Sequence, residues 1–256
     1  MSTVDISLTD VAASLALIAL AIGVSYWRRA ELEQDLAVAV LRSFVQLTAI
    51  GYVIQAIFDS DSLWLVAALL AVMVGFGAFT ARSRAKAVPG VLGPLVLALT
   101  AAAAITLGLV LALGVFEAEP RYLVPVGGMV IGNSMTAAAV ALNRLADEVH
   151  GQAGLIEAML ALGANSGQAA RGLVTRSLRS GMIPLIDSTK TTGIVFFPGT
   201  MVGMLVAGAE PIDAVRLQLI LLWVLLGSVA IAALISVSLG YRGFFTPAHQ
   251  LKEPPA

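Results

Sequence analysis

Long apolar stretches constrain this chain more than any other feature. A helix needs about 20 apolar residues to cross the hydrocarbon core of a bilayer. The 256 residues are 59% hydrophobic and only 12% charged, which is unlike a soluble globular domain. The sequence therefore predicts an all-α, polytopic membrane protein with one transmembrane domain over residues 1–256. Seven spans are expected, at Leu8 to Trp27, Leu36 to Phe58, Leu63 to Thr80, Val91 to Phe116, Tyr122 to Leu142, Ile183 to Ala209 and Val215 to Gly240.

Basic residues fall mainly on one side of these spans. Cytoplasmic loops of membrane proteins carry an excess of Lys and Arg. An outside amino terminus leaves Arg121 and Arg216 outside and Arg42 within a span, so the other 12 of the 15 basic residues lie inside. We therefore expect the amino terminus outside and the carboxyl terminus in the cytoplasm. The charges gather into no basic face, so no nucleic-acid partner is expected.

A polar insert at residues 143–182 separates the fifth and sixth predicted spans, on the cytoplasmic side. Its segment 154–163 places apolar side chains on one side of a helical wheel, which predicts a short amphipathic helix. Ser166 is a candidate cap for a second, basic helix, which Gly181 and Pro184 are expected to interrupt. An amphipathic helix that merely lies at the membrane surface is the alternative interpretation.

The short helix carries a motif with a known counterpart. Glu157-Ala158-x-x-x-x-Gly163 resembles the Glu-Ala-Ala-x-x-x-Gly loop of ABC-transporter permeases, with Met159 in place of the second alanine. In that interpretation the helix fits a cleft on a soluble motor subunit, and its small side chains permit close approach. The residues expected to couple to the motor are Glu157, Ala158, Met159, Gly163, Arg171 and Arg176.

Three further motifs extend the resemblance. Together with the loop above, Val124 to Met135, Thr189 to Gly193 and Phe197 to Met204 resemble the FetB iron-export permease family, which also contains half-size permeases linked to aluminium tolerance in plants. The resemblance covers about Arg28 to Gly240. It implies a permease subunit that pairs with a separate ATPase, as two copies of each, and exports iron across the plasma membrane. A nucleotide-sugar, or another anionic or chelated solute, is the alternative cargo.

The lysines independently favour a separate ATPase. A phosphate-binding loop of the form G-x-x-x-x-G-K-[ST] needs a glycine before its lysine. Lys86, Lys190 and Lys252 follow Ala, Thr and Leu instead. We therefore expect no enzymatic activity and no cofactor on this chain, with ATP and Mg²⁺ bound by the partner.

Several residues within the spans are candidates for the translocation pathway. Asn133 and Ser134 lie mid-span, where polar side chains either bond a neighbouring helix or face a pathway. Arg42, with Gln46 one turn on, either snorkels to the headgroups or favours an anionic cargo. The full set of candidates is Arg42, Gln46, Asn133, Ser134, Met135, Pro198, Gly199 and Met201.

Methionines and glycines recur in the fifth and sixth spans. Met129, Met135, Met201 and Met204 either fill apolar gaps or offer thioethers to a soft metal, so the metal ligands remain unknown. The pairs Gly128 with Gly132 and Gly199 with Gly203 predict close helix packing.

Two other function classes are weaker. A secondary transporter needs ionisable residues near the bilayer midplane. The polar residues found there are Asn133 and Ser134, and neither can carry a proton. A membrane enzyme needs a nucleophile and base or paired histidine ligands within the spans, and both histidines, His150 and His249, lie in cytoplasmic segments. Tyr241 to Ala256, with three prolines, is predicted to be a disordered tail.

Overall fold

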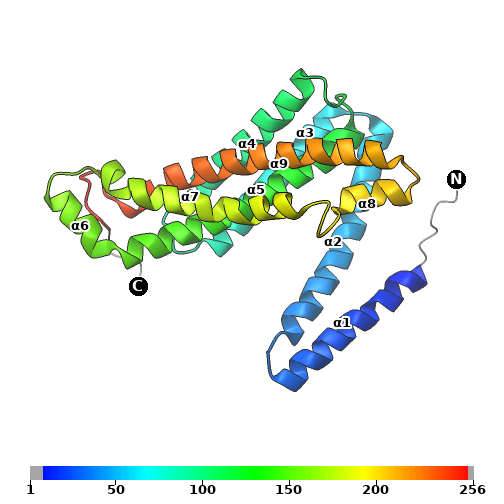
Figure 1. The fold of residues 1–256 in the computed structure, drawn as a ribbon, viewed down its shortest axis with the longest axis horizontal. Helices are drawn as coiled ribbons and strands as arrows, with labels where there is room; N and C mark the ends of the chain where they lie inside the picture. The colour runs from blue at the N-terminus through cyan, green and yellow to red at the C-terminus, as the bar shows by residue number, and fades with distance from the viewer. Residues whose placement is uncertain (1–7, 253–256) are drawn as a thin grey trace.

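The computed structural model describes residues 8–252, and its regular structure is helical apart from two isolated β-bridges (Figure 1). The all-α prediction is confirmed for this part of the chain. Its helices are α1 (Leu8–Arg28), α2 (Glu33–Ser60), α3 (Leu63–Arg84), α4 (Leu92–Ala112), α5 (Pro120–Gly151), α6 (Ala153–Ala161), α7 (Ser166–Thr191), α8 (Gly199–Val206), α9 (Pro211–Gly240) and the 3-10 turn η1 (Tyr241–Phe244).

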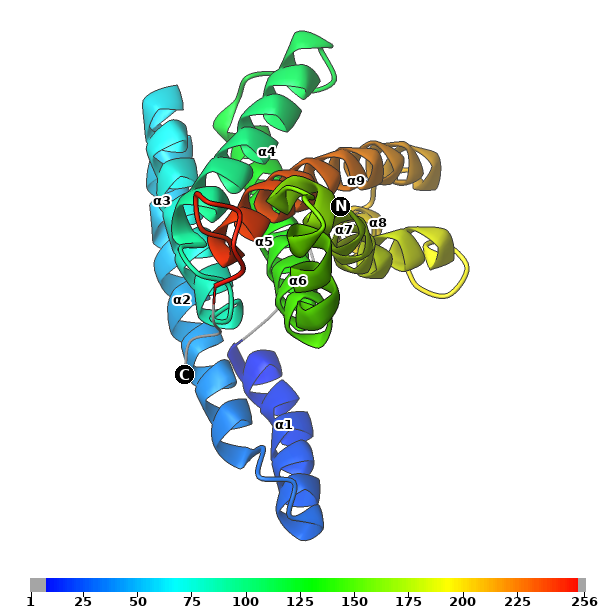
Figure 2. The same ribbon diagram turned by 90° about the vertical axis from the view of Figure 1, so that its left-hand side faces the viewer.

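Helix α5 lies at the centre of the bundle, in contact with α3, α4, α7 and α9 (Figure 2). Its buried face is rich in alanine, and Ala138 and Ala141 are fully buried. Small side chains let helices approach closely, which is the main source of packing energy between helices that lie in lipid. Larger apolar side chains such as Leu142 and Leu145 fill the space toward the end of α5.

The hairpin of α1 and α2 projects away from this bundle (Figures 1 and 2). Its large apolar side chains are exposed, among them Leu17 at 71%, Leu41 at 66% and Leu47 at 70% of their surface. Such surface is stable only against lipid or another apolar protein surface. The pathway candidates Arg42 and Gln46 lie on α2 and are exposed as well.

Six helices, α1 to α5 and α9, are long and apolar enough to cross a membrane. The predicted sixth span, Ile183 to Ala209, is not one continuous helix. It consists of the end of α7, a loop at 192–198 and the eight-residue α8, which is only about 12 Å long. Gly193 adopts a left-handed φ of 85° in that loop, and Pro198 disfavours a helical conformation in the residue before it.

The insert also differs from its prediction at three points. Helix α5 continues to Gly151, well beyond the predicted end of span 5. Helix α7 runs unbroken through Gly181 and Pro184 to Thr191, because its contacts with α5 and α9 outweigh the loss of one backbone hydrogen bond at proline. Its cap is Asn165 and not Ser166, which is the first residue of the helix.

Residues 241–252, predicted as part of a disordered tail, are folded. Phe244 and Phe245 are 4% and 5% exposed, so they belong to the core. The chain turns after η1, and the Lys252 amide donates to the Phe244 carbonyl at 2.8 Å. Burial of these two aromatic side chains in the core stabilises the folded segment. Residues 253–256 of the predicted tail lie outside the described residues.

Candidate functional site

Helix α6 ends in a sharp turn that only glycine adopts readily. Gly163 has a φ of 93°. Its amide donates to the Leu160 carbonyl at 3.0 Å, and the Ala164 amide donates to the Met159 carbonyl at 3.0 Å. This pair of bonds is a Schellman motif, which satisfies the last carbonyls of a helix by placing a left-handed residue after it. Gly163 therefore fixes the direction in which the chain leaves α6.

Helix α6 has one anchored face and one exposed face. Ile156 is 1% exposed and packs into the core, while Met159 packs partly against that core. Glu157 and Ala158 are exposed. Leu162, just beyond the helix, is 89% exposed. Of the predicted coupling residues on α6, the structure thus presents Glu157 and Ala158 outward and turns Met159 inward.

The turn from α6 into α7 is held on both sides. The Asn165 side chain accepts from the Gln168 amide at 2.9 Å, and the Gln168 side chain accepts from the Asn165 amide at 2.9 Å. This reciprocal capping box satisfies two backbone donors at the start of α7. The Ser166 hydroxyl lies 2.9 Å from His249 Nδ1, so the carboxyl-terminal segment meets the same turn. Arg171, another predicted coupling residue, is exposed on α7.

A buried carboxylate joins α5 to α7. The Glu148 side chain is 6% exposed, and its Oε2 accepts from Arg176 Nε at 2.8 Å. Arg144, one turn earlier on α5, pairs with the other carboxylate oxygen. Gln152 donates to Glu148 and accepts from Arg176 Nη2 at 3.1 Å. We call Arg144, Glu148, Gln152 and Arg176 the Glu148 clamp.

The clamp binds Arg176, one of the predicted coupling residues, within the chain. Its guanidinium pairs with Glu148 although its side chain is 48% exposed, whereas Arg171 is exposed. Losing one member of a buried ion pair is costly, because the remaining charge stays desolvated. Sequence reasoning missed Glu148. The available signal was the Arg144 and Glu148 spacing of i, i+4, which brings the two side chains together on a helix.

A cavity of about 250 Å³ lies between α5, α7 and α9. The cavity is open to the surface of the chain: its polar lining comes from Asn133 and Thr136, which are exposed, and from Ser188, which is half-buried. The Asn133 amide also donates to the Met129 carbonyl at 2.8 Å, which fixes its orientation. Ser134, the adjacent candidate, is fully buried on another face and does not line this cavity. The structure therefore separates the two polar residues that the sequence placed together.

The other pathway candidates do not line that cavity. Arg42 and Gln46 are exposed on α2, while Met135 is half-buried and faces α3 near Gly77. Pro198 and Gly199 form the start of α8, where Met201 is 8% exposed. Among residues 8–252 no group of three or more His, Cys, Asp or Glu side chains is placed to hold a metal ion.

The glycines expected to pack closely do so only in part. An added Cβ at Gly128 would lie 3.1 Å from Met73 Cε. At Gly132, Gly199 and Gly203 it would meet nothing within 4 Å, so the predicted close packing is not made within the chain there. Tighter contacts occur at other glycines. An added Cβ at Gly181 of α7 would lie 2.7 Å from the Ala137 carbonyl oxygen of α5.

Comparison with known proteins identifies relatives over nearly the whole chain. The model of a family described as "Uncharacterised protein family (UPF0014)" matches residues 8–245. "Protein ALUMINUM SENSITIVE 3" of Arabidopsis thaliana is 38% identical over 94% of this chain and 88% of its own length. "Probable iron export permease protein FetB" of Escherichia coli is 33% identical, over 98% of this chain and 97% of its own length. "UPF0014 membrane protein YjkA" of Bacillus subtilis is 36% identical over 99% of each chain. No solved structure is a significant match.

Proposed function

The chain belongs to the UPF0014 family of multi-pass membrane proteins, and on that premise we propose that it is the permease subunit of an ABC transporter whose ATPase is a separate chain. The observation that carries this proposal is that α6 is exposed at Glu157 and Ala158 while Ile156 anchors its other face in the core, directly after the end of α5 that the Glu148 clamp joins to α7. A short helix that is exposed on one side and fixed on the other can transmit a force.

Orientation and assembly form part of the proposal. The amino terminus lies outside, and α6 lies in the cytoplasm, where the excess of basic residues belongs. The end of α7 together with α8 forms a seventh, broken crossing beside α9. Broken helices occur in transporters where the loop lines a cavity or is covered by protein. Two copies of the permease assemble with two ATPases, and the exposed α1–α2 hairpin supplies apolar surface for lipid or the second copy.

The transport step follows from the connections between these elements. ATP-driven closure of the partner would displace α6, and the displacement would reach α5 through Gln152, which precedes α6, and α7 through the bonds of Glu148 and Gln152 to Arg176. Both helices line the cavity at Asn133 and Ser188, so its opening would change with the nucleotide state. Such rigid-body movement of packed helices is a common route to alternating access.

Iron is the proposed cargo, moved outward. A relative that is 33% identical carries the name of a probable iron export permease. The cavity offers amide and hydroxyl oxygens from Asn133, Thr136 and Ser188, which are the hard ligand type that iron accepts. A nucleotide-sugar or another anionic solute is the second candidate, because Arg42 would favour negative charge if a second copy covered α2.

Single cysteines provide a direct test, since the chain has none of its own. Glu157→Cys on α6 is compared with Glu117→Cys in the loop that precedes α5, and both residues are exposed. In inside-out vesicles a membrane-impermeant thiol reagent should label position 157 and leave position 117 unlabelled. The reverse pattern would refute the orientation and, with it, the coupling role of α6.

Partner and cargo are tested next. Crosslinking through Glu157→Cys should capture an ATP-hydrolysing subunit. Inverted vesicles that contain both chains should then accumulate labelled iron only with ATP. Ala158→Arg should abolish this uptake, whereas Ala248→Arg on the exposed carboxyl-terminal turn should leave it intact. Uptake of a nucleotide-sugar but not of iron would make the nucleotide-sugar the cargo. Absence of any captured ATPase would refute the permease assignment.

A further inference from the structure

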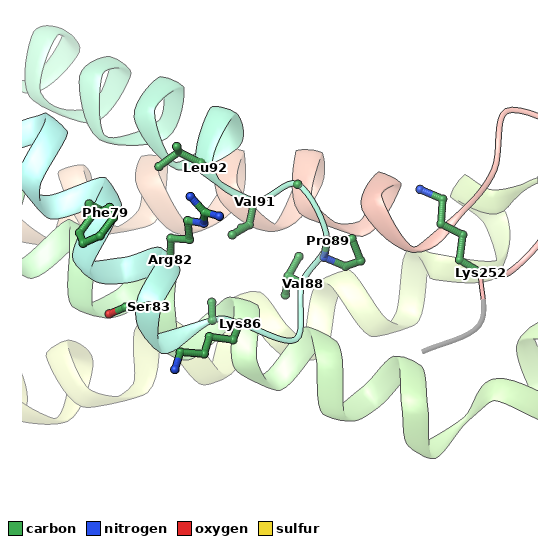
Figure 3. A pocket seen from close by; sticks show the side chains of 11 residues that line it. Phe79, Arg82, Ser83, Lys86, Val88, Pro89, Val91, Leu92 and Lys252 are labelled. Carbon is green, nitrogen blue, oxygen red and sulfur yellow. The ribbon is translucent and has the colours of Figure 1, made fainter. Parts of the chain in front are cut away.

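A second and larger hollow, of about 900 Å³, lies where α3 ends and α4 begins (Figure 3). It is distinct from the cavity between α5, α7 and α9. Its walls come from the last turn of α3, the loop at 85–91, the first residue of α4 and the carboxyl-terminal segment. Arg82 and Lys86 lie on the α3 side, and Lys252 lies beyond the loop (Figure 3).

The charge of this hollow is positive and uncompensated. Arg82, Lys86 and Lys252 line it together with the Ser83 hydroxyl, and its lining includes no Asp or Glu. None of these three cations forms an ion pair with any residue between 8 and 252, although Lys252 Nζ donates to the Gly243 carbonyl at 2.9 Å. Arg82 reaches toward the start of α4, Lys86 points away from Arg82, and Lys252 lies beyond the loop (Figure 3), so it is the summed field of the three cations that attracts an anion to this surface.

The walls are fixed before any ligand arrives. Ala85 and Val91, at the two ends of the loop, are 0% and 3% exposed, and Val88 in its middle is 3% exposed, so the core holds the loop along its length. The carboxyl-terminal segment packs against the same loop without a gap, since an added Cβ at Gly243 would lie 2.3 Å from the Pro89 carbonyl oxygen. Lys252 is therefore held near the loop, and binding would need little reorganisation.

Apolar surface borders the basic residues. Phe79 is 61% exposed, and Leu92 and Val96 of α4 are 37% and 40% exposed. Arg82 extends between Phe79 and the start of α4 (Figure 3). Helix α4 begins without a side-chain cap, so its first backbone N–H groups add partial positive charge at this edge. The site thus combines a polar end that suits a phosphate with an apolar side that suits an acyl chain.

We propose that this pocket binds the headgroup phosphate of an anionic phospholipid, with its acyl chains along α3 and α4. Basic pockets between membrane helices at the bilayer surface bind such headgroups. Free phosphate would satisfy the cations but leave Phe79 and Leu92 uncovered. The bound lipid would hold the loop at 85–91 at the headgroup level, independently of cargo or ATPase.

Native mass spectrometry of the full chain in non-ionic detergent tests the proposal. Phosphatidylglycerol is titrated against phosphatidylcholine with the same acyl chains and against inorganic phosphate. The double variant Arg82→Gln with Lys86→Gln is compared with Arg171→Gln with Arg179→Gln, which removes the same charge from exposed residues of α7. Each lost cation should weaken lipid binding about fivefold, so the pocket variant should lose about 25-fold and the α7 variant little.

Three results would overturn the proposal. The first is equal binding of phosphatidylcholine and phosphatidylglycerol, and the second is an equal loss of affinity in both double variants. The third is displacement of phosphatidylglycerol by inorganic phosphate, which would make free phosphate the ligand. Should the pocket double variant fail to fold, Lys252→Gln alone tests the site, because Lys252 is exposed on the carboxyl-terminal segment. It should weaken phosphatidylglycerol binding about fivefold, and an unchanged affinity would refute the site.

Discussion

The crossing of α5 and α7 at Gly181 leads to a quantitative prediction for Gly181→Ala. The added Cβ would lie 2.7 Å from the Ala137 carbonyl oxygen and 2.8 Å from the Ala141 Cβ. An ordinary carbon–oxygen contact is about 3.3 Å or more, so the two helices would have to separate by about half an ångström. Neither obstacle can rotate aside, because one is backbone and the other is the short side chain of alanine.

Overpacking of this kind costs about 1–3 kcal/mol. Alanine is also favoured over glycine within a helix by about 1 kcal/mol, and this gain must be separated from the clash. Gly132→Ala on α5 is the matched control, since its added Cβ would meet nothing within 4 Å. The free energy of unfolding of Gly181→Ala should therefore fall about 1–3 kcal/mol below that of Gly132→Ala.

Equilibrium unfolding in mixed detergent micelles measures this difference. Transport in inverted vesicles should fall with Gly181→Ala as well, because the separated helices both line the cavity beside Asn133. Equal free energies of unfolding for the two variants would refute the reasoning, since α5 and α7 would then not approach as closely as described.

Three further substitutions have defined outcomes. Glu148→Gln should destabilise the chain by about 1–3 kcal/mol, because Arg144 and Arg176 lose their shared carboxylate. Asp147→Asn, on the exposed face of α5, should leave the stability unchanged, and equal thermal unfolding of the two variants in detergent would contradict this prediction. Asn133→Leu should reduce ATP-driven transport at unchanged stability, and full transport would remove Asn133 from the pathway. Gly163→Ala should speed amide hydrogen exchange in α6, because a left-handed conformation costs alanine about 1–2 kcal/mol. Gly154→Ala, whose added Cβ would meet nothing within 4 Å, should leave the exchange rates unchanged. Equal exchange rates in the two variants would refute the role of the turn.

Much of the helical architecture can be predicted from the sequence because it depends on local hydropathy. The first five predicted spans and the last correspond to α1 to α5 and α9, although α5 continues past the predicted end of its span. The break after Thr191 is harder to predict, since Ile194 to Phe197 is as apolar as a helix in lipid. Gly193 and Pro198 were the available signals, and both occur within many unbroken membrane helices as well.

The site was predictable only where one element suffices to define it. A helical wheel of the α6 segment correctly places Glu157 outward and Ile156 inward, but it also puts Leu155 and Leu162 on the apolar side, and these are 58% and 89% exposed. The Glu148 clamp does not follow from such a wheel, because it depends on Arg176, which lies 28 residues further along the chain. The folded segment that contains Phe244 depends in the same way on its contacts with the rest of the bundle.

The hydrogen bond between Ser166 and His249 has a consequence for how the bundle moves. This bond joins the carboxyl-terminal segment, which follows α9 and η1 in the chain, to the first residue of α7. In the proposed transport cycle, a displacement that reached this turn would act on the carboxyl-terminal segment as well as on α7. Helix α9 also packs directly against α5 and α7, so removal of this one exposed hydrogen bond should loosen the carboxyl-terminal segment and leave α9 in place within the bundle.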